Sequence, residues 1–454
     1  MNNKLKLHTT LLILSLGLVF AALSYAEEPP LTRVPAWGVG MSYRSAQIPF
    51  DLQTHHVSTM VPLFYYQGEY FFLDGASGGL HLWQSEPAAI HNAFSFRPMS
   101  DWQLDLHSQL RFTNIPKSKQ NQQQADAVDV GLRLRHQFND SNWGAFGGYT
   151  DSDGRWYADA TWGQSWLLDS WLLEPTLRAR YKEASFNTRY YANVVGSDEQ
   201  LGGGTELYAG LNSRWHLYSN LYLLGNLGYT YLDEAVRNSE KVSRSGQGEA
   251  WLGFGFFESP HQMRASNLLP KGSYLRLAHG WATPADIGEV LVLQNKSDPH
   301  NNQMTSIFYG HPLANELFNT PIDLYLTPGF AWHWPSSVQS DIQEYVMAFK
   351  GYYTFRWPFT WRLGMAEGIS YVSNITGIEK AEMEEKGYRP SHLMNYLDFS
   401  ADTNVGEIFG VPSLKPLWLG YSLHHRSAMF ETSSEFGRIK GGSNYNTVYL
   451  QWQF

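Results

Sequence analysis

The sequence predicts an all-β protein that crosses a membrane as an antiparallel β-barrel. Three observations lead to this prediction. Apolar and polar residues alternate with a period of two over whole segments, many of these segments run about 10 to 13 residues, and the chain contains 17 Trp, 27 Tyr and 25 Phe. A tilted strand needs about 9 to 11 residues to cross a bilayer, and aromatic girdles mark both interfaces of such barrels.

The composition excludes several other classes of protein. Charged residues make up only 17% of the chain, and its many aromatic residues exclude a disordered or coiled-coil protein. The absence of cysteine excludes disulfides and thiolate metal ligands. A formal net charge of −9 argues against nucleic acid as a partner. We expect no cofactor and no metal site, because the histidines are scattered and form no H-E-x-x-H motif.

Residues 1–26 have the pattern of a cleaved secretory signal peptide. Lys4 and Lys6 form a basic start, residues 11–23 an apolar run, and residues 24–26 a small-residue cleavage site. No later run of about 18 apolar residues could form a membrane-spanning helix. Export combined with long alternating strands predicts the outer membrane of a Gram-negative cell, with its lipids and the barrel-assembly machinery as partners.

The alternation is clearest in a few segments. Between residues 102 and 112 the apolar members are Trp102, Leu104, Leu106, Leu110 and Phe112. Between residues 128 and 138 they are Val128, Val130, Leu132, Leu134 and Phe138. The last six residues also alternate and end on Phe454, an ending that resembles the assembly signal of bacterial outer-membrane proteins.

The strand candidates fall into two groups, of roughly thirteen and then eight. They centre near residues 40, 61, 71, 81, 93, 107, 132, 147, 159, 176, 209, 225 and 252, and then near 276, 307, 327, 348, 366, 398, 422 and 449. In residues 259–271 apolar and polar residues do not alternate, which predicts a linker. We predict tandem barrels of about 12 and 8 strands, formed by residues 27–258 and 272–454. One barrel of about 20 strands remains an alternative.

The N-terminal half resembles a known family. Its segments Trp37–Gly40, Val61–Tyr66, Glu69–Gly75 and Gly78–Trp83 are similar to the opening of the MltA-interacting protein/OmpV (MipA/OmpV) family, over about residues 31–258. The resemblance implies an outer-membrane barrel. Some members are proposed as scaffolds for cell-wall enzymes, so periplasmic murein enzymes are implied partners, and no catalytic residues are implied.

The C-terminal half, residues 272–454, resembles PagL-type lipid A 3-O-deacylases. The similarity lies in the segment 423–427, which contains His425-Arg426-Ser427, and in the segment 441–445 that follows a loop. It implies a Ser nucleophile, a His base and lipopolysaccharide as substrate. That family carries its catalytic acid on the strand after His-x-Ser, whereas here the nearest later acids, Glu431 and Glu435, fall in an expected loop.

Strand parity provides a separate argument for the same residues. Leu419, Tyr421 and Leu423 form the lipid-facing side of their strand, and residues two apart share a face, so His425 and Ser427 lie on that side as well. The same count places further polar residues on the outer face of adjacent strands, near the extracellular end: Glu367, Asn395, Asn444 and Asn446. The lumen-facing His424 is expected to be structural.

Acyl transfer to a serine needs a nucleophile, a base within reach and a group that orients the base. We predict Ser427 as nucleophile and His425 as base, oriented by Glu367 or, in second place, by Asn444 or Glu435. A polar rim that water and lipid headgroups satisfy is the alternative explanation of this patch. Three functions thus remain open: lipid A ester hydrolysis in the outer leaflet, a scaffold for murein-synthesising enzymes, and a passive channel.

Overall fold

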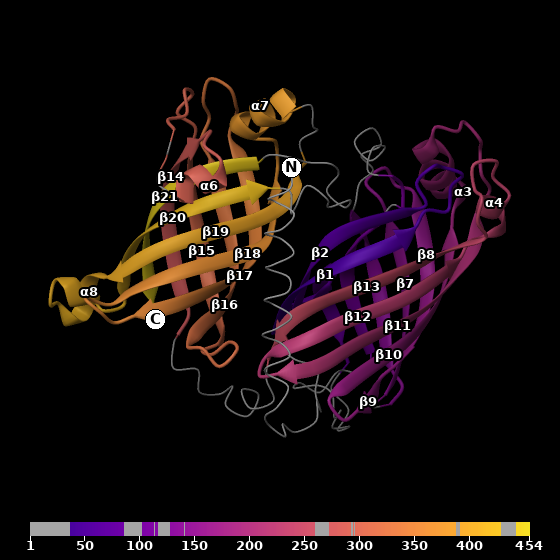
Figure 1. Ribbon diagram of the computed structural model, residues 1–454, viewed down its shortest axis with the longest axis horizontal. Helices are drawn as coiled ribbons and strands as arrows, with labels where there is room; N and C mark the ends of the chain where they lie inside the picture. The colour runs from indigo at the N-terminus through magenta and orange to yellow at the C-terminus, as the bar shows by residue number, and fades with distance from the viewer. Residues whose placement is uncertain are drawn as a thin grey trace, which may run out of the picture.

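Two closed antiparallel barrels lie side by side in the computed structural model (Figure 1). It describes residues 37–85, 102–112, 114–116, 128–139, 141–258, 272–291, 294, 296–386, 391–427 and 442–454. The predicted signal peptide, the predicted linker, Glu431 and Glu435 lie outside these residues. The barrels use separate segments of the chain, so each can be described from its own strands.

The N-terminal barrel contains the first thirteen strands of the described residues. They are β1 (Trp37–Gln47), β2 (His56–Gln67), β3 (Phe71–Gly75), β4 (Ser77–Gln84), β5 (Trp102–Leu110), β6 (Val128–Gln137), β7 (Asn142–Thr150), β8 (Trp156–Gln164), β9 (Trp166–Leu168), β10 (Trp171–Lys182), β11 (Gly204–Tyr218), β12 (Leu221–Tyr231) and β13 (Gly246–Phe257). The pairing of β10 with β11 and of β1 with β13 closes twelve of them, while the three-residue β9 only extends the edge of β10.

The C-terminal barrel has eight strands. They are β14 (Tyr274–Thr283), β15 (Gln303–Ala314), β16 (Ile322–His333), β17 (Ile342–Phe355), β18 (Trp361–Val372), β19 (Leu393–Asn404), β20 (Leu417–Ser427) and β21 (Gly442–Gln453). The first strand, β14, pairs with the last, β21, and closes the barrel. Because β1 pairs with β13 and not with β21, the tandem arrangement is confirmed and the single barrel of about 20 strands is wrong.

Short helices lie at the barrel ends. Those of the N-terminal barrel are α3 (Ala184–Asn187), η1 (Thr188–Ala192), η2 (Asn193–Val195) and α4 (Glu234–Arg237). Those of the C-terminal barrel are α6 (Ile287–Leu291), α7 (Gly377–Lys386), α8 (Val405–Ile408) and η3 (Pro412–Leu414). No helix in the described part of the chain is long and apolar enough to cross a membrane.

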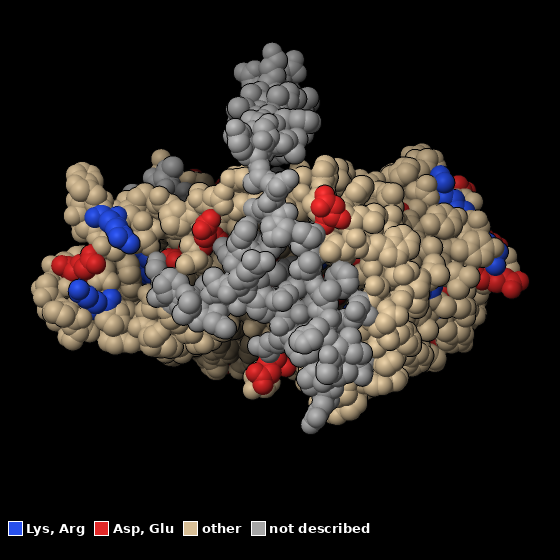
Figure 2. All heavy atoms as spheres, turned by 90° about the horizontal axis from the view of Figure 1, so that it is seen from below, with Lys and Arg blue, Asp and Glu red and all other residues tan. Residues whose placement is uncertain are grey.

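The outer walls of both barrels are apolar and solvent-exposed, as the alternation predicts. Leu252 of the first barrel is 62% exposed and Leu277 of the second is 56% exposed. In Figure 2 the charged side chains gather mainly toward the two ends of the view and leave much of the wall without charge. Closed pairing with apolar side chains outside is the structure of a transmembrane barrel of the outer-membrane type.

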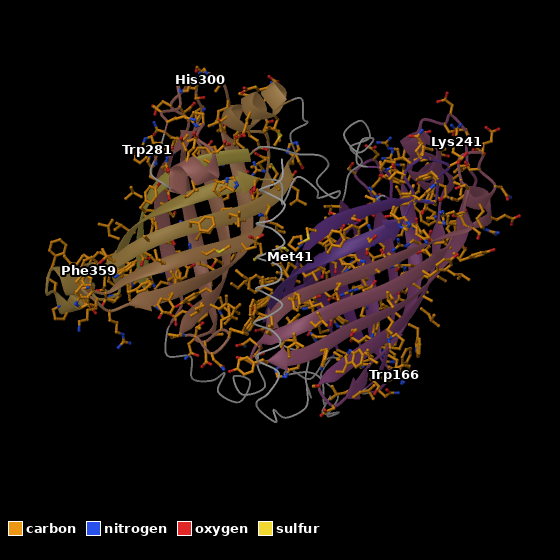
Figure 3. All side chains as sticks on the ribbon, in the orientation of Figure 1. Met41, Trp166, Lys241, Trp281, His300 and Phe359 are labelled. Carbon is orange, nitrogen blue, oxygen red and sulfur yellow. The ribbon has the colours of Figure 1, made fainter. Side chains whose placement is uncertain are left out.

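Loop length distinguishes the two ends of the C-terminal barrel. The long connections that carry α6 and α7 leave one end, whereas shorter turns and Phe454 lie at the other. In Figure 3 His300 and Trp281 lie near the first end and Phe359 near the second. Outer-membrane barrels have long extracellular loops and short periplasmic turns, so we name the ends accordingly.

Ion pairs fill the lumen of the C-terminal barrel. Asp398 of β19 accepts hydrogen bonds from Arg276, at 2.6 Å, and from Lys350. Arg362 pairs with Asp402 at 2.7 Å. All five side chains are at most 4% exposed. Buried charges are tolerated when each has a partner, so this lumen is a packed polar core.

The two barrels touch through apolar side chains. Phe64 of β2 stacks on Phe349 of β17, with ring centroids 5.8 Å apart, in a cluster that also contains Trp37, Leu324 and Leu326. At the periplasmic ends, the Ser219 hydroxyl donates to the amide oxygen of Asn319 at 2.9 Å. The walls that meet are β1 to β3 on one side and β15 to β18 on the other.

The predicted strand positions correspond closely to the observed strands. The candidate near residue 93 lies outside the described residues, and β9 was not predicted. At three residues, β9 is too short to show a period-two pattern.

Removing the shared carboxylate of the C-terminal lumen should destabilise that barrel. Asp398→Asn leaves the buried Arg276 and Lys350 without their counter-charge, which should cost about 3–5 kcal/mol of unfolding free energy. Urea unfolding of the purified protein in detergent measures it. Glu384→Gln is the control, because its side chain is 67% exposed and lies 4.0 Å from Lys380. Equal midpoints for both variants would contradict the structural role of Asp398.

The two barrels should fold independently. Each closes on its own strands, so residues 27–258 and 272–454, expressed separately with a signal peptide, should each give a heat-modifiable band on gel electrophoresis. Failure of either half to resist unfolding in cold detergent would show that it depends on its neighbour.

Candidate active site

His425 and Ser427 lie at the extracellular end of β20, on its outer face. Leu419 and Tyr421 precede them on that face and are exposed, whereas Ser422 and Arg426 point into the lumen and are fully buried. Ser427 is half-buried and His425 is 8% exposed. The strand parity therefore places the two side chains as the alternation predicts.

Asn444 of β21 hydrogen-bonds His425. The residues are direct cross-strand partners, and His425 Nδ1 lies 2.5 Å from Asn444 Oδ1. The Asn444 amide nitrogen donates to the carbonyl oxygen of Ala285 at 2.7 Å. Because that bond turns Oδ1 toward the ring, and an amide oxygen only accepts, His425 must donate through Nδ1. Its Nε2 is then the unprotonated nitrogen, as a general base requires.

The segment from Ala285 through α6 covers one side of this pair. Ala285, Ile287 and Val290 pack against Leu423, which is only 1% exposed although it lies on the outer face. Lys296 hydrogen-bonds Glu289 of α6 at 2.8 Å and thereby lowers the pKa of that carboxyl. The segment is therefore held against the barrel wall beside His425 rather than projecting into solvent.

Ser427 faces a second amide across the other strand interface. Its cross-strand partner on β19 is Asn395, which is 2% exposed and hydrogen-bonds Glu367 of β18. The amide oxygen of Asn395 has no hydrogen-bond partner. Among the described residues His425 and Ser427 do not hydrogen-bond each other, and Nε2 of His425 makes no hydrogen bond.

Glu367 does not meet His425. Both lie in the row that runs through Leu397, two strands apart, a separation of roughly 10 Å. Glu367 therefore sits on the Ser427 and Asn395 side of the patch, whereas Asn444 occupies the position beside the imidazole. Of the three orienting groups predicted, the described structure brings Asn444 to His425, and Glu435 lies outside the described residues.

Asn446 of the predicted patch and the lumen-facing His424 have other partners. Asn446 accepts a hydrogen bond from Tyr421 on the neighbouring strand. His424 points into the lumen, where its Nε2 lies 3.0 Å from Glu344, which also contacts His333 at 2.8 Å. His424 thus belongs to the buried ionic core, in agreement with its predicted structural role.

Helix α7 fixes the ends of the strands that carry the site. Arg426 donates to Glu379 at 2.5 Å, and the backbone N–H of Gly442 donates to Glu382 at 3.0 Å. Burial raises the pKa of Glu379 to about 6, although the adjacent Arg426 opposes this shift. Strand β20 is therefore anchored to α7 at Arg426, one residue before Ser427. Strand β21 is anchored to α7 at Gly442, two residues before Asn444.

Sequence reasoning missed the contribution of Ala285. Its carbonyl lies in a connection with no motif, 159 positions from Asn444, so no local pattern could indicate it. No group of three or more His, Cys, Asp or Glu within the described ranges could hold a metal ion.

The comparison with protein families gives one match. Residues 38–257 match the family described as MltA-interacting protein MipA. The match covers the N-terminal barrel from β1 to β13 and does not extend to β14–β21. No curated protein matches the chain.

Several solved structures show a weak overall likeness. OprB of Pseudomonas putida is 8% identical, with 92% of this chain and 93% of that chain covered and a TM-score of 0.23. OmpT of Vibrio cholerae is 8% identical, with 93% and 100% covered and a TM-score of 0.22. The copper transporter OprC is 10% identical, with 94% and 82% covered and a TM-score of 0.23.

Proposed function

We propose that the C-terminal barrel hydrolyses ester-linked acyl chains of lipid A in the outer leaflet, with Ser427 as nucleophile, His425 as base and Asn444 as the orienting group. The observation that supports this proposal is the bond from His425 Nδ1 to Asn444, which leaves Nε2 of the neutral ring unprotonated, two residues before Ser427 on the same face of β20. A headgroup-solvated polar rim would not require this tautomer.

The reaction follows from these positions. Nε2 of His425 accepts the Ser427 hydroxyl proton while Oγ attacks the ester carbonyl carbon. The imidazolium then gives that proton to the departing sugar hydroxyl, which leaves an acyl-serine. Water, deprotonated by Nε2, attacks the acyl-serine, and release of the fatty acid returns the proton to Oγ. Asn395 faces Ser427, so its amide N–H can donate to the developing oxyanion.

Asn444 stands where a catalytic triad usually has an acid. The substitution removes the negative charge beside His425 but keeps the hydrogen bond to its Nδ1. A neutral amide stabilises the imidazolium less than a carboxylate does, but it fixes the tautomer equally well when its oxygen faces the ring. Cysteine proteases of the papain type use a His–Asn pair of this kind. The departure from the deacylase pattern noted in the sequence therefore leaves the proposed chemistry workable.

The position of the site suits a lipid substrate. Ser427 pairs with Gly442, the first residue of β21, so the reacting groups lie at the extracellular end on the lipid-facing wall. An acyl chain anchored in the outer leaflet could reach them without leaving the membrane. The packed lumen of this barrel offers no comparable route from inside.

Substitutions at the site should remove deacylation. Ser427→Ala and His425→Ala should each reduce it to background, because the two residues act as one unit, and Asn444→Ala should cost about 10²- to 10⁴-fold. Mass spectrometry of lipid A from cells that express each variant is the measurement. The barrel fold is checked by heat-modifiable migration.

Two controls lie on the same strands but face the lumen. Ser443→Ala removes a buried hydroxyl that makes no hydrogen bond, and His424→Ala alters only the lumen cluster, so both should retain deacylation. If the Ser427→Ala barrel assembles and still removes the acyl chain at the wild-type rate, the polar-rim explanation should replace this proposal.

The family match favours a second function for the N-terminal barrel. The matched family is named for an interaction with MltA, so we propose that this barrel has a scaffold role for murein enzymes at the periplasmic face. Purification of the full chain and of the Ser427→Ala variant should then recover the same cell-wall enzymes. Recovery of none from either would reject the scaffold.

A further inference from the structure

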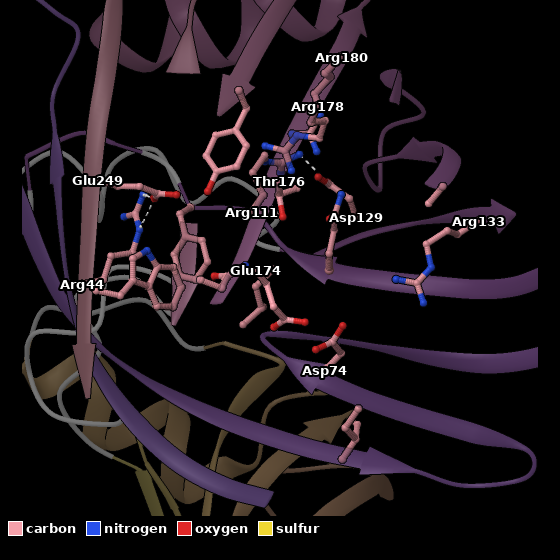
Figure 4. A pocket seen from close by; sticks show the side chains of 18 of the residues that line it. Arg44, Asp74, Arg111, Asp129, Arg133, Glu174, Thr176, Arg178, Arg180 and Glu249 are labelled. Atoms are coloured by element: carbon pink, nitrogen blue, oxygen red, sulfur yellow. Dashed lines mark hydrogen bonds and ion pairs between the residues drawn. The ribbon is translucent and has the colours of Figure 1, made fainter. Parts of the chain in front are cut away.

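The lumen of the N-terminal barrel holds a cavity of about 1060 Å³. Guanidinium groups, carboxylates and aromatic rings line it, and Figure 4 shows Arg111, Arg178 and Arg180 gathered near one end, with Asp74 and Glu174 facing one another further along. This lumen differs from that of the smaller barrel, where every cation of the described strands has a carboxylate partner: Arg276, Lys350, Arg362 and Arg426.

Most cations around the cavity are also paired. The pairs are Arg44 with Glu249 at 2.8 Å, Arg111 with Asp129 at 2.5 Å, Arg133 with Asp105 at 3.0 Å, Arg180 with Asp159 at 2.8 Å, and Lys182 with Glu206 at 2.8 Å. In these five pairs each buried cation is neutralised by a carboxylate of the barrel itself, so none of them requires a bound anion.

Three lining arginines lack such partners. Arg135, Arg178 and Arg214 form no hydrogen bond or ion pair within the described residues, and the Nε of each is buried without an acceptor. Each guanidinium lies over an aromatic ring: Trp143 at 5.0 Å, Tyr208 at 4.8 Å and Phe257 at 5.0 Å. A ring face leaves the N–H donors at the guanidinium edge unused.

Arg135 and Arg178 lie three strands apart in one row of the lumen wall. The row runs from Arg135 through Ala145 and Thr161 to Arg178. Three strand spacings put the two arginine backbones roughly 14 Å apart, with only small side chains between them in the row. In the next row the indole of Trp143 lies over Gly163, and the same ring contacts the guanidinium of Arg135.

The carboxylates Asp74 and Glu174 also line the cavity, within electrostatic range of Arg135. Glu174 interacts electrostatically with Arg214, Asp74 and Arg135, and it accepts only a hydrogen bond from Ser165, at 3.3 Å. These carboxylates would repel a ligand that is anionic throughout, but they accept hydrogen bonds from hydroxyl groups. The cavity is thus suited to a polyol that carries one oxyanion group.

Packed side chains lie at the end of the barrel near α3. Tyr190 of η1 hydrogen-bonds Asp151 at 2.7 Å, and Val194 and Val195 pack with Ile48, Phe50 and Ile115. Elsewhere the lining reaches Trp37 and Glu258, the first residue of β1 and the residue after β13, and it also includes Leu313 of β15 in the neighbouring barrel.

From these observations we propose that the N-terminal barrel binds a sugar acid or sugar phosphate, with the oxyanion held by Arg135 and Arg178 and the hydroxyl groups directed toward Glu174. Charge-assisted, bidentate hydrogen bonds from arginine are the usual way to hold a carboxylate or phosphate. The proposal is independent of the site on β20.

The test uses the purified full chain in detergent and two matched pairs of disaccharides. Isothermal titration compares lactobionate with lactose, and trehalose 6-phosphate with trehalose. At least one charged member should bind about tenfold or more tightly than its neutral counterpart, and the affinity should fall as salt is added. The preferred pair distinguishes a carboxylate from a phosphate ligand.

Variants tie the binding to the two arginines. The double substitution Arg135→Gln, Arg178→Gln should weaken binding of the charged sugar about tenfold or more, whereas Arg244→Gln, an exposed residue before β13, should not change it. Equal binding of charged and neutral sugars, no binding by any probe, or unchanged affinity in a folded double variant would each overturn the proposal. If the double variant fails to fold, the comparison of charged with neutral sugars on the wild-type protein still tests whether the barrel prefers an anionic sugar.

Discussion

The absence of water from the hydrocarbon of a bilayer is the constraint on which this structure depends. Every backbone N–H and C=O at membrane depth must pair with another strand, so each sheet has to close on itself. Closure then divides the side chains into an outer set that meets lipid and an inner set that faces the lumen. The ionic clusters of the two lumens follow from that division.

The two barrels differ because they differ in circumference. Eight strands leave an interior just wide enough for side chains to fill, and here Arg276, Lys350 and Asp398 fill it with a connected set of charges. Twelve strands leave more space than their lining residues occupy. The same kind of side chain that forms a core in one lumen therefore borders a cavity in the other.

The sequence was sufficient to predict the fold class, the division near residue 258 and the face on which His425 and Ser427 lie. These features follow from the alternation of apolar and polar residues within single strands, which can be recognised without knowing which strands pair. It could not identify Asn444 as the partner of His425. That contact depends on the register between β20 and β21, and a slip of one residue would turn Asn444 to the other face. It also depends on Ala285, a carbonyl supplied by a distant connection.

The contact between the barrels has a consequence for their lateral behaviour. Phe64 and Phe349 meet at membrane depth, where lipid tails are as apolar as the rings, so their association gains little from the hydrophobic effect. Shape complementarity, hydrogen bonds such as that from Ser219 to Asn319, and the peptide connection between β13 and β14 must keep the barrels together in the plane of the membrane. The connection restricts two-dimensional diffusion, holding each barrel at a high effective concentration near the other. Lipids at the edge of this contact would then lie close to Glu367, which is the cross-strand partner of Phe349 on β18 and brings an acidic group to the border of the contact surface.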